Sequence, residues 1–195
     1  MALPMIVLAS TSRYRRELLA RLRCPFDVQA PHVDETALPS EAPRETAVRL
    51  ALDKAAAVAA RLPGSIVIGS DQTVDVDGIS LGKPMSHEAA LAQLQSLQGR
   101  TAVFYTGLAV IGPKTNGVQV DCVSTTVKFK NLPKEKLEAY LHADQPYDCA
   151  GSARIEGLGI ALVERVTNDD PSALIGLPLI QLTTMLDNEG IGIIR

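Results

Sequence analysis

The stretch VIGSDQTVDVDG, residues 67–78, combines two signals of β structure with a carboxylate between them. The apolar run Ile66–Ile68 ends at a Gly-Ser pair, and short apolar runs bounded by turn residues are typical of buried strands. After Asp71, apolar and polar residues alternate around Asp77-Gly78, a dipeptide typical of a hairpin turn. The sequence therefore predicts a buried strand with Asp71 at its tip, followed by a hairpin.

Helices and strands are expected to alternate on both sides of this stretch. Helical spacing of leucines, an N-capping Ser86 and stops at Pro63-Gly64 and Gly99 mark the helices. The expected strands are 5–9, 65–71, 73–76, 79–81, 101–111, 118–130 and 159–166, and the expected helices are 15–24, 44–62, 87–98, 134–142 and 177–190. Early alternation followed by paired strands predicts an α/β protein whose mixed β-sheet has flanking helices.

Composition narrows the class of protein. The 195 residues are 46% hydrophobic, which suits one large domain or two small lobes with a sizeable core. A formal charge of −3, with only four tyrosines and three phenylalanines, argues against nucleic-acid binding. The chain has no apolar run of the roughly 20 residues that a membrane span needs, so no membrane partner is expected.

Cysteines and histidines give no sign of a structural metal site. Cys24, Cys122 and Cys149 are scattered, and an odd, unpaired set suggests reduced thiols in a cytoplasmic protein. The start MALPMIVLAS lacks the basic segment and cleavage site of a signal peptide, which fits the same location. The three histidines, at 32, 87 and 142, have no ligand spacing, and each is expected to be a surface or loop residue.

The segment LASTSRYRREL, residues 8–18, has an unusual distribution of charge. A hydroxyl-rich turn, Ser10 to Ser12, leads into a helix that begins with Arg13, Arg15 and Arg16. A helix start carries partial positive charge and prefers acidic residues, so three arginines there favour a bound anion. Exposed N–H groups, hydroxyls and guanidinium groups together could form a phosphate site. The alternative is a capped helix with solvated surface arginines.

Two lysines are also candidates. Lys54 lies on an apolar helical stripe, where it either snorkels to solvent or directs its ammonium into a site. Lys83 follows a strand end in SLGKPMS and is either an ordinary loop lysine or a phosphate ligand. The absence of GxxxxGK[ST] excludes a P-loop.

Carboxylates come from two separate segments, Asp34-Glu35 in the loop 30–43 and Asp71. Such a set suits a hard divalent cation that also binds substrate phosphates, although Asp71 could instead cap the following turn. Cleavage of a phosphoanhydride needs cationic groups, a metal ion and a base that deprotonates water. The arginines and lysines could supply the cationic groups, and the carboxylates could bind the metal and act as the base.

Six motifs occur in the order typical of the Maf family: LASTSRYRRELL, PHVDET, VIGSDQTV, GKP, CAGSARIEGLG and IGLPL. The chain resembles that family from Leu8 to about Leu179. The resemblance implies a nucleoside triphosphate pyrophosphatase, a fold similar to the inosine-triphosphate pyrophosphatases, and one domain over 1–195 with two lobes around a central cleft. It also implies a homodimer and Mg²⁺, with Mn²⁺ or Co²⁺ as alternatives.

The resemblance assigns roles to individual residues. Asp71 matches the proton acceptor and, with Glu35, the carboxylates near the metal. The residues expected to bind the substrate phosphates are Ser10, Arg15, Lys54 and Lys83. Arg13 departs from the family pattern, which often has proline there.

Three positions bear on the nucleobase. A subgroup that acts on dTTP and UTP typically has Arg, Thr and Gln, whereas this chain has Tyr14, Gln72 and Glu156. This set is similar to that of the 7-methyl-GTP pyrophosphatases, so the resemblance implies hydrolysis of 7-methyl-GTP to 7-methyl-GMP. The alternatives are a pyrophosphatase that prefers dTTP or UTP, and a nucleotide-binding regulator of septum formation.

Overall fold

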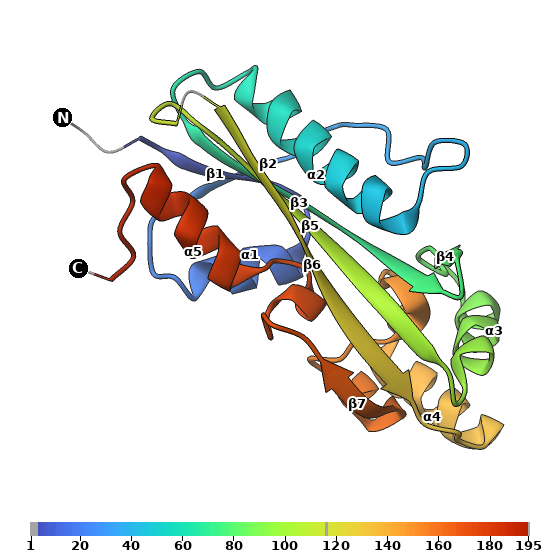
Figure 1. Ribbon diagram of the computed structural model, residues 1–195. Coiled ribbons are helices and arrows are strands. Elements are labelled where there is room, and N and C mark those ends of the chain that lie inside the picture. Colours follow the sequence, from blue (N-terminus) through green and yellow to red (C-terminus); the bar gives the residue numbers. More distant parts are fainter. Residues whose placement is uncertain (1–3, 116, 195) are drawn as a thin grey trace. The chain divides into compact units, whose positions relative to one another are not determined.

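A mixed β-sheet with helices packed against it makes up the fold (Figure 1). The computed structural model describes residues 4–115 and 117–194, and seven strands of this part form the sheet in the order β2-β1-β3-β5-β6-β7, with β4 paired to β3. The strands are β1 Ile6–Ala9, β2 Asp27–Gln29, β3 Ile66–Val76, β4 Ile79–Leu81, β5 Thr101–Gly112, β6 Gly117–Phe129 and β7 Val163–Thr167. Because β1 pairs in parallel with β2 and β3, whereas β4 and β7 pair antiparallel, the predicted mixed sheet is confirmed.

Five α-helices and three short 3₁₀ helices connect the strands in the described part of the chain. The α-helices are α1 Arg13–Ala20, α2 Pro43–Ala59, α3 His87–Leu97, α4 Lys134–Asp144 and α5 Leu179–Asn188. The 3₁₀ helices are η1 Ala150–Ser152, η2 Leu158–Leu162 and η3 Ala173–Ile175. Among the described residues, no helix combines the length and the apolar character that crossing a membrane requires.

The chain divides into two compact units, and β3, β5 and β6 contribute residues to both. The first unit contains Met1–Asp71, Thr106–Val123 and Asp170–Arg195, and the second contains Gln72–Tyr105 and Ser124–Asp169. The predicted cleft between two lobes stays a prediction.

β1 and the first half of β3 are buried on both faces of the sheet. Strand residues of alternating position face opposite sides. Ile6, Leu8, Ile66 and Ile68 pack against leucines of α1 and α5, while Val7, Ala9 and Val67 pack against α2. This explains why β1 is apolar at every position rather than at every second one.

Two glycines allow α2 to lie directly on the sheet. A methyl group at Gly69 would overlap the backbone of Ala51 and Ala55, and one at Gly107 would overlap the backbone of Ala47. The side of β3 that bears Gly69 therefore meets α2 backbone to backbone. This close approach brings the C-terminal half of α2 within side-chain reach of the next residue on the same side of β3, Asp71.

The second unit is built around a hairpin and two helices. Asp77 and Gly78 form the turn between β3 and β4 with φ of 52° and 83°, as the Asp-Gly dipeptide predicts. Ser86 caps α3 by accepting a hydrogen bond from the Ala89 N–H at 3.2 Å, which is also as predicted. The aromatic rings of Phe104 and Phe129 are fully buried in this unit.

Several predicted element boundaries are wrong, most clearly in three elements. The helix expected over 15–24 spans Arg13–Ala20 because Ser12 caps its start and the chain turns with a φ of 54° at Arg23. The strand expected over 159–166 begins only at Val163, because the Gly159 N–H donates to the Arg154 carbonyl at 3.0 Å and the chain coils into η2. β3 continues through the residues after Asp71 without a break. The turn predicted between β5 and β6 includes Asn116, which lies outside the described residues.

Replacing Gly69 with alanine is expected to destabilise the protein, since the added methyl group would force α2 away from the sheet. Overpacking of this kind costs about 1–3 kcal/mol, which corresponds to a fall in Tm of about 2–12 °C for a domain of this size. Gly82→Ala is the matched control, because a methyl group at Gly82 would meet no atom within 4 Å. Thermal unfolding of both variants, followed by circular dichroism, measures the difference; equal Tm values would show that α2 tolerates the shift.

Candidate active site

Asp71 is a buried carboxylate in the middle of a strand. It is 8% exposed, and β3 continues beyond it to Val76. The prediction that Asp71 lies at a strand tip is therefore wrong, and so is the alternative that it caps a turn, because the turn comes only at Asp77-Gly78. The alternation that begins at Thr73 continues the strand instead of starting a new one. Because residues of β3 precede and follow Asp71, the strand holds the Asp71 backbone in place.

Lys54 of α2 lies between two carboxylates. Its side-chain nitrogen, Nζ, is 2.6 Å from Asp71 Oδ1 and 2.8 Å from Glu35 Oε1. Lys54 is 3% exposed, so it does not snorkel to solvent, and an ammonium buried in this way requires paired anions. Glu35, by contrast, has a side chain that is 53% exposed. The two predicted carboxylates thus converge on one cationic group in the first unit.

The loop that carries Glu35 is fastened to α2. Arg49 donates to Glu41 Oε1 at 2.6 Å and to the Thr36 carbonyl at 3.1 Å. Hydrogen bonds from Arg49 lower the pKa of Glu41 to about 2, so this carboxylate stays charged. Asp34 accepts a hydrogen bond from the Thr36 N–H at 2.9 Å, so it shapes the loop, while its neighbour Glu35 contacts Lys54.

Arg15 brings a second cation to the same carboxylates. Burial lowers the pKa of its guanidinium, and the nearby Asp71 and Glu35 carboxylates raise it in part. The guanidinium keeps its charge, because arginine does not lose its proton in proteins. Its Nε donates to the Gly176 carbonyl at 2.9 Å, which fixes the plane of the group. Arg15 and Lys54 together balance the two carboxylates, so these four side chains have no net charge.

Ser70 is a residue that sequence reasoning did not select. Its hydroxyl lies 2.8 Å from the Gly107 carbonyl and 3.0 Å from the Gly176 carbonyl, the same carbonyl that Arg15 contacts. The segment containing Gly176 is held by Ser172 and Asp170, both buried: the Ser172 hydroxyl donates to Asp170 Oδ1 at 2.6 Å. The position of Ser70 in the motif VIGSD was the only signal for it.

The turn before α1 retains its charge conflict. Ser12 accepts a hydrogen bond from the Arg15 N–H at 3.4 Å, the buried Ser10 accepts one from the Ser12 N–H at 3.1 Å, and no acidic residue lies in the first turn of α1. The arginines differ in environment, since Arg13 is exposed whereas Arg15 is partly buried.

Tyr14 contacts a cation in this structure. The guanidinium carbon of Arg13 lies 4.6 Å from the centre of the Tyr14 ring, and an Arg13 N–H donates to the Tyr14 hydroxyl at 2.5 Å. The face of the ring therefore already attracts a positive group. Arg13, which departs from the family pattern, therefore contacts the ring and the hydroxyl of Tyr14.

The other predicted residues belong to the second unit. Gln72 follows Asp71 in β3, so its side chain points to the opposite face of the sheet, the face that bears Ser70. Lys83 is exposed after β4, and Glu156 is exposed in the turn between η1 and η2. The loop of Glu156 is anchored by Arg154, which pairs with the buried Asp144 and whose N–H donates to the Tyr140 hydroxyl at 2.9 Å. The roles of all three predicted residues stay predictions.

The carboxylates fit a hard divalent cation. Magnesium prefers oxygen ligands, and Glu35 and Asp71 each direct a carboxylate oxygen at the same positive group, the Lys54 ammonium. A site that converges on one cation in this way has the donor chemistry that a second, divalent cation needs. Glu35 and Asp71 would be its ligands from the protein.

The chain is similar to known proteins over nearly its whole length. Residues 5–189 match the family described as Maf-like protein. Proteins named 7-methyl-GTP pyrophosphatase are similar over nearly the whole chain. The one from Albidiferax ferrireducens is 51% identical over 97% of this chain and 95% of its own, and the one from Burkholderia thailandensis is 54% identical over 97% and 89%. The Methylobacillus flagellatus protein of the same name is 50% identical over 98% of this chain and 100% of its own.

Among solved structures, the Ham1 protein of Staphylococcus aureus matches 65% of this chain and 72% of its own, with a TM-score of 0.47 and 22% identity. The family match covers almost all of the chain, including the segments that carry Arg15, Glu35, Lys54 and Asp71. The chain therefore belongs to the Maf-like protein family.

Proposed function

We propose that the chain is a metal-dependent nucleoside triphosphate pyrophosphatase that hydrolyses 7-methyl-GTP to 7-methyl-GMP and pyrophosphate, and so removes a modified nucleotide from the pool. The observation that carries the proposal is the buried Asp71 carboxylate held by Lys54 at 2.6 Å beside Glu35. The relatives named 7-methyl-GTP pyrophosphatase support the reaction and the substrate, because they are 50–54% identical over nearly the full chain.

Asp71 serves as the base in this proposal. Lys54 contacts Oδ1 of the carboxylate, which leaves Oδ2 to orient a water molecule and take its proton. The water oxygen bonds to phosphorus as the bond between the α and β phosphoryl groups breaks, and pyrophosphate leaves. The proton on Asp71 then passes to solvent. A strand residue suits this role, because its backbone cannot move away from the substrate.

Cationic and hydroxyl groups bind the triphosphate. Arg15 has a fixed guanidinium plane, and a planar pair of N–H donors suits phosphate oxygens. Ser10, Lys54 and Lys83 complete the proposed phosphate set.

A divalent cation, Mg²⁺ or alternatively Mn²⁺ or Co²⁺, is proposed at Glu35 and Asp71. When bound, the cation neutralises triphosphate oxygens and polarises the phosphorus that is attacked. The protein's part is to hold the carboxylates: Arg49 fastens the loop of Glu35, and β3 fixes Asp71.

Tyr14, Gln72 and Glu156 are proposed to select the nucleobase. Methylation of guanine at N7 leaves a positive charge on the ring, and an aromatic face attracts such a cation. In this proposal the methylated base takes the place of the Arg13 guanidinium over Tyr14. Glu156 accepts two hydrogen bonds from N1–H and N2–H of guanine, as in other charge-assisted bidentate pairs.

The enzyme is proposed to be located in the cytoplasm and to be active as a homodimer. No nucleic-acid partner is proposed. Cys24, Cys122 and Cys149 are free thiols, which suits a reducing compartment. Burial raises the pKa of Cys24 and of Cys122, so both remain protonated and unreactive.

Asp71→Asn is expected to lower kcat for 7-methyl-GTP by about 10²–10⁴, the contribution of general-base catalysis, while nucleotide binding persists because the shape is kept. The control is Asp53→Asn on α2, whose side chain is 46% exposed and pairs only with Arg49 among the described ion pairs. Steady-state release of pyrophosphate measures kcat, and calorimetry measures binding. Wild-type kcat in Asp71→Asn would show that Asp71 is structural. A wild type that binds nucleotide without turnover would instead favour the septum regulator.

Activity is expected to disappear in excess EDTA and to return when Mg²⁺ is added back. Two carboxylates and a triphosphate would otherwise repel each other strongly. Glu35→Gln should raise the Mg²⁺ concentration for half-maximal activity by about tenfold, the effect of losing roughly 1.4 kcal/mol of metal binding. The initial rate is measured as a function of free Mg²⁺ in both proteins. Full activity in EDTA contradicts the metal requirement.

Tyr14→Ala is expected to lower kcat/KM for 7-methyl-GTP more than for GTP, by about 2- to 30-fold, which corresponds to a cation–π energy of about 0.5–2 kcal/mol. Glu156→Gln should weaken use of 7-methyl-GTP and improve relative use of UTP and dTTP, since an amide suits the pyrimidine edge. The measurement is kcat/KM for the four nucleotides in wild type and both variants. An unchanged ranking rejects the assignment of the base, and a wild-type preference for UTP or dTTP favours the alternative pyrophosphatase.

A further inference from the structure

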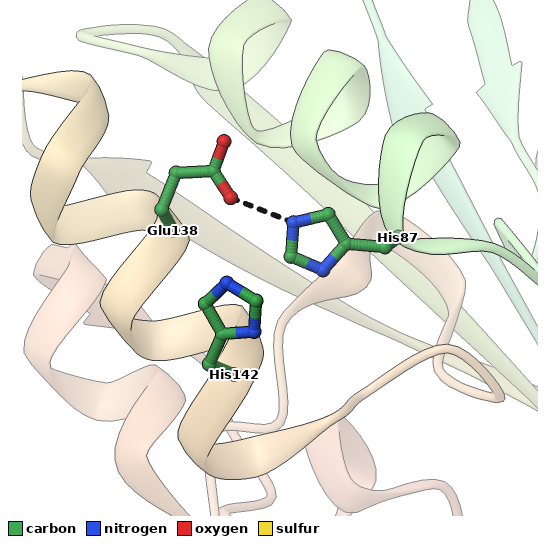
Figure 2. Close-up of side chains that lie close together, drawn as sticks. All are labelled: His87, Glu138 and His142. Atoms are coloured by element: carbon green, nitrogen blue, oxygen red, sulfur yellow. Dashed lines mark hydrogen bonds and ion pairs between the residues drawn. The ribbon is translucent and has the colours of Figure 1, made fainter.

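Three potential metal ligands meet in the second unit. His87 is the first residue of α3, and Glu138 and His142 lie one turn apart on α4. Figure 2 shows the three side chains facing one another, with Glu138 and His142 extending from the same side of α4 toward His87. His142 is a surface residue, as expected, whereas His87 is half-buried at the start of α3, and the two imidazole rings stack on each other.

The ligand atoms are close enough to share one ion. His87 Nε2 lies 2.6 Å from Glu138 Oε2, and one ligand atom from each residue lies within 4.8 Å of the others. Ligand atoms around a tetrahedral zinc ion, with bonds of about 2.0–2.2 Å, are about 3.3 Å apart. His87 Nε2 and Glu138 Oε2 would separate slightly to admit the ion.

His142 would have to turn toward the ion. The two imidazole rings stack with centroids 4.8 Å apart and planes 28° apart, and the lone pair of a ring nitrogen lies in the ring plane. His142 is exposed, so rotation of its ring about χ2 costs little packing. His142 lies in the last turn of α4, and a helix carboxyl end carries partial negative charge, so this position favours a bound metal cation.

Tyr147 prepares His87 for a metal. His87 Nδ1 lies 3.0 Å from the Tyr147 hydroxyl, whose proton is directed at the Leu141 carbonyl 3.4 Å away. The tyrosine oxygen then accepts the Nδ1 proton, which leaves Nε2 as the coordinating atom. Metal-bound histidines commonly have this second contact at the other ring nitrogen. The Met85 N–H donates to the Tyr147 carbonyl at 3.0 Å, so Tyr147 is fixed to the segment just before α3.

We propose that His87 Nε2, Glu138 and His142 form a binding site for a borderline transition-metal ion, of which Zn²⁺ is the type, with water as the fourth ligand. Two imidazoles and one carboxylate are the donors that zinc takes at open sites, whereas Mg²⁺ prefers oxygen donors alone. The site is separate in donors from the proposed magnesium site at Glu35 and Asp71, and it does not depend on the proposed hydrolysis.

The test is titration of the full chain with ZnCl₂ in excess Mg²⁺, which occupies the oxygen-ligand carboxylates. Isothermal calorimetry is expected to give one zinc equivalent for the wild type. His142→Gln and Glu138→Gln should each raise the zinc Kd at least about tenfold, and Tyr147→Phe should raise it by about 10- to 100-fold, as the loss of a partner to a ligating histidine does. His32→Gln is the matched control, since His32 is the one histidine outside the cluster, and its Kd should equal that of the wild type.

Thiols are the competing ligands, so the titration is repeated with Cys24, Cys122 and Cys149 changed to serine, after circular dichroism confirms folding. Zinc binding that survives these changes and is lost in His142→Gln supports the proposal. Anomalous diffraction at the zinc edge from a soaked crystal then locates the ion independently of folding in any variant. A wild type without a zinc equivalent, an ion located only at a cysteine, or variants of the cluster that bind like the wild type would each overturn it.

Discussion

The buried ammonium of Lys54 is the constraint on which the candidate active site depends. Removing an ammonium from water costs several kcal/mol unless anions pair with it, and Lys54 is 3% exposed, with Asp71 and Glu35 as its partners. Helix α2 therefore cannot move along or away from β3 without unpairing charges. The close approach at Gly69 imposes the same position by packing alone. Electrostatics and packing thus define a single arrangement of the helix, the strand and the carboxylate between them.

Charge balance at the four side chains bears on the proposed metal requirement. Arg15 and Lys54 neutralise Glu35 and Asp71, so these side chains leave no surplus positive charge for a triphosphate. A nucleotide that enters this environment brings several negative charges of its own. Arg15 is tied to the Gly176 carbonyl and Lys54 to two carboxylates, so the proposed phosphate contacts would be made to cations that are already fixed in place. In the proposed function, a divalent cation at Glu35 and Asp71 would add the positive charge that the phosphates require.

The sequence selected residues that prove to be neighbours, but it described their surroundings poorly. Asp71, Lys54 and Glu35 were all candidates from the sequence, and the structure brings these three side chains into contact, while their roles stay predictions. The end of β3 was wrong because Gly69-Ser70 resembles a turn, although Gly69 serves helix packing instead. Ser70 was missed because its partners are backbone carbonyls, which have no signature in a sequence.

The histidine cluster was also missed, because one of its members comes from a distant part of the sequence. Glu138 and His142 have the i, i+4 spacing of helical neighbours, which the sequence displays. His87 is 51 residues from Glu138 and joins them only because α3 packs on α4, so no local pattern includes it.

The two groups of side chains also differ in the metal ions that they suit. The first unit gathers oxygen donors around an ammonium, while the second gathers imidazole nitrogens around a carboxylate, and these donor sets select different metals. Because Mg²⁺ competes poorly for imidazole nitrogens, the cluster on α3 and α4 could hold a borderline ion even in excess magnesium.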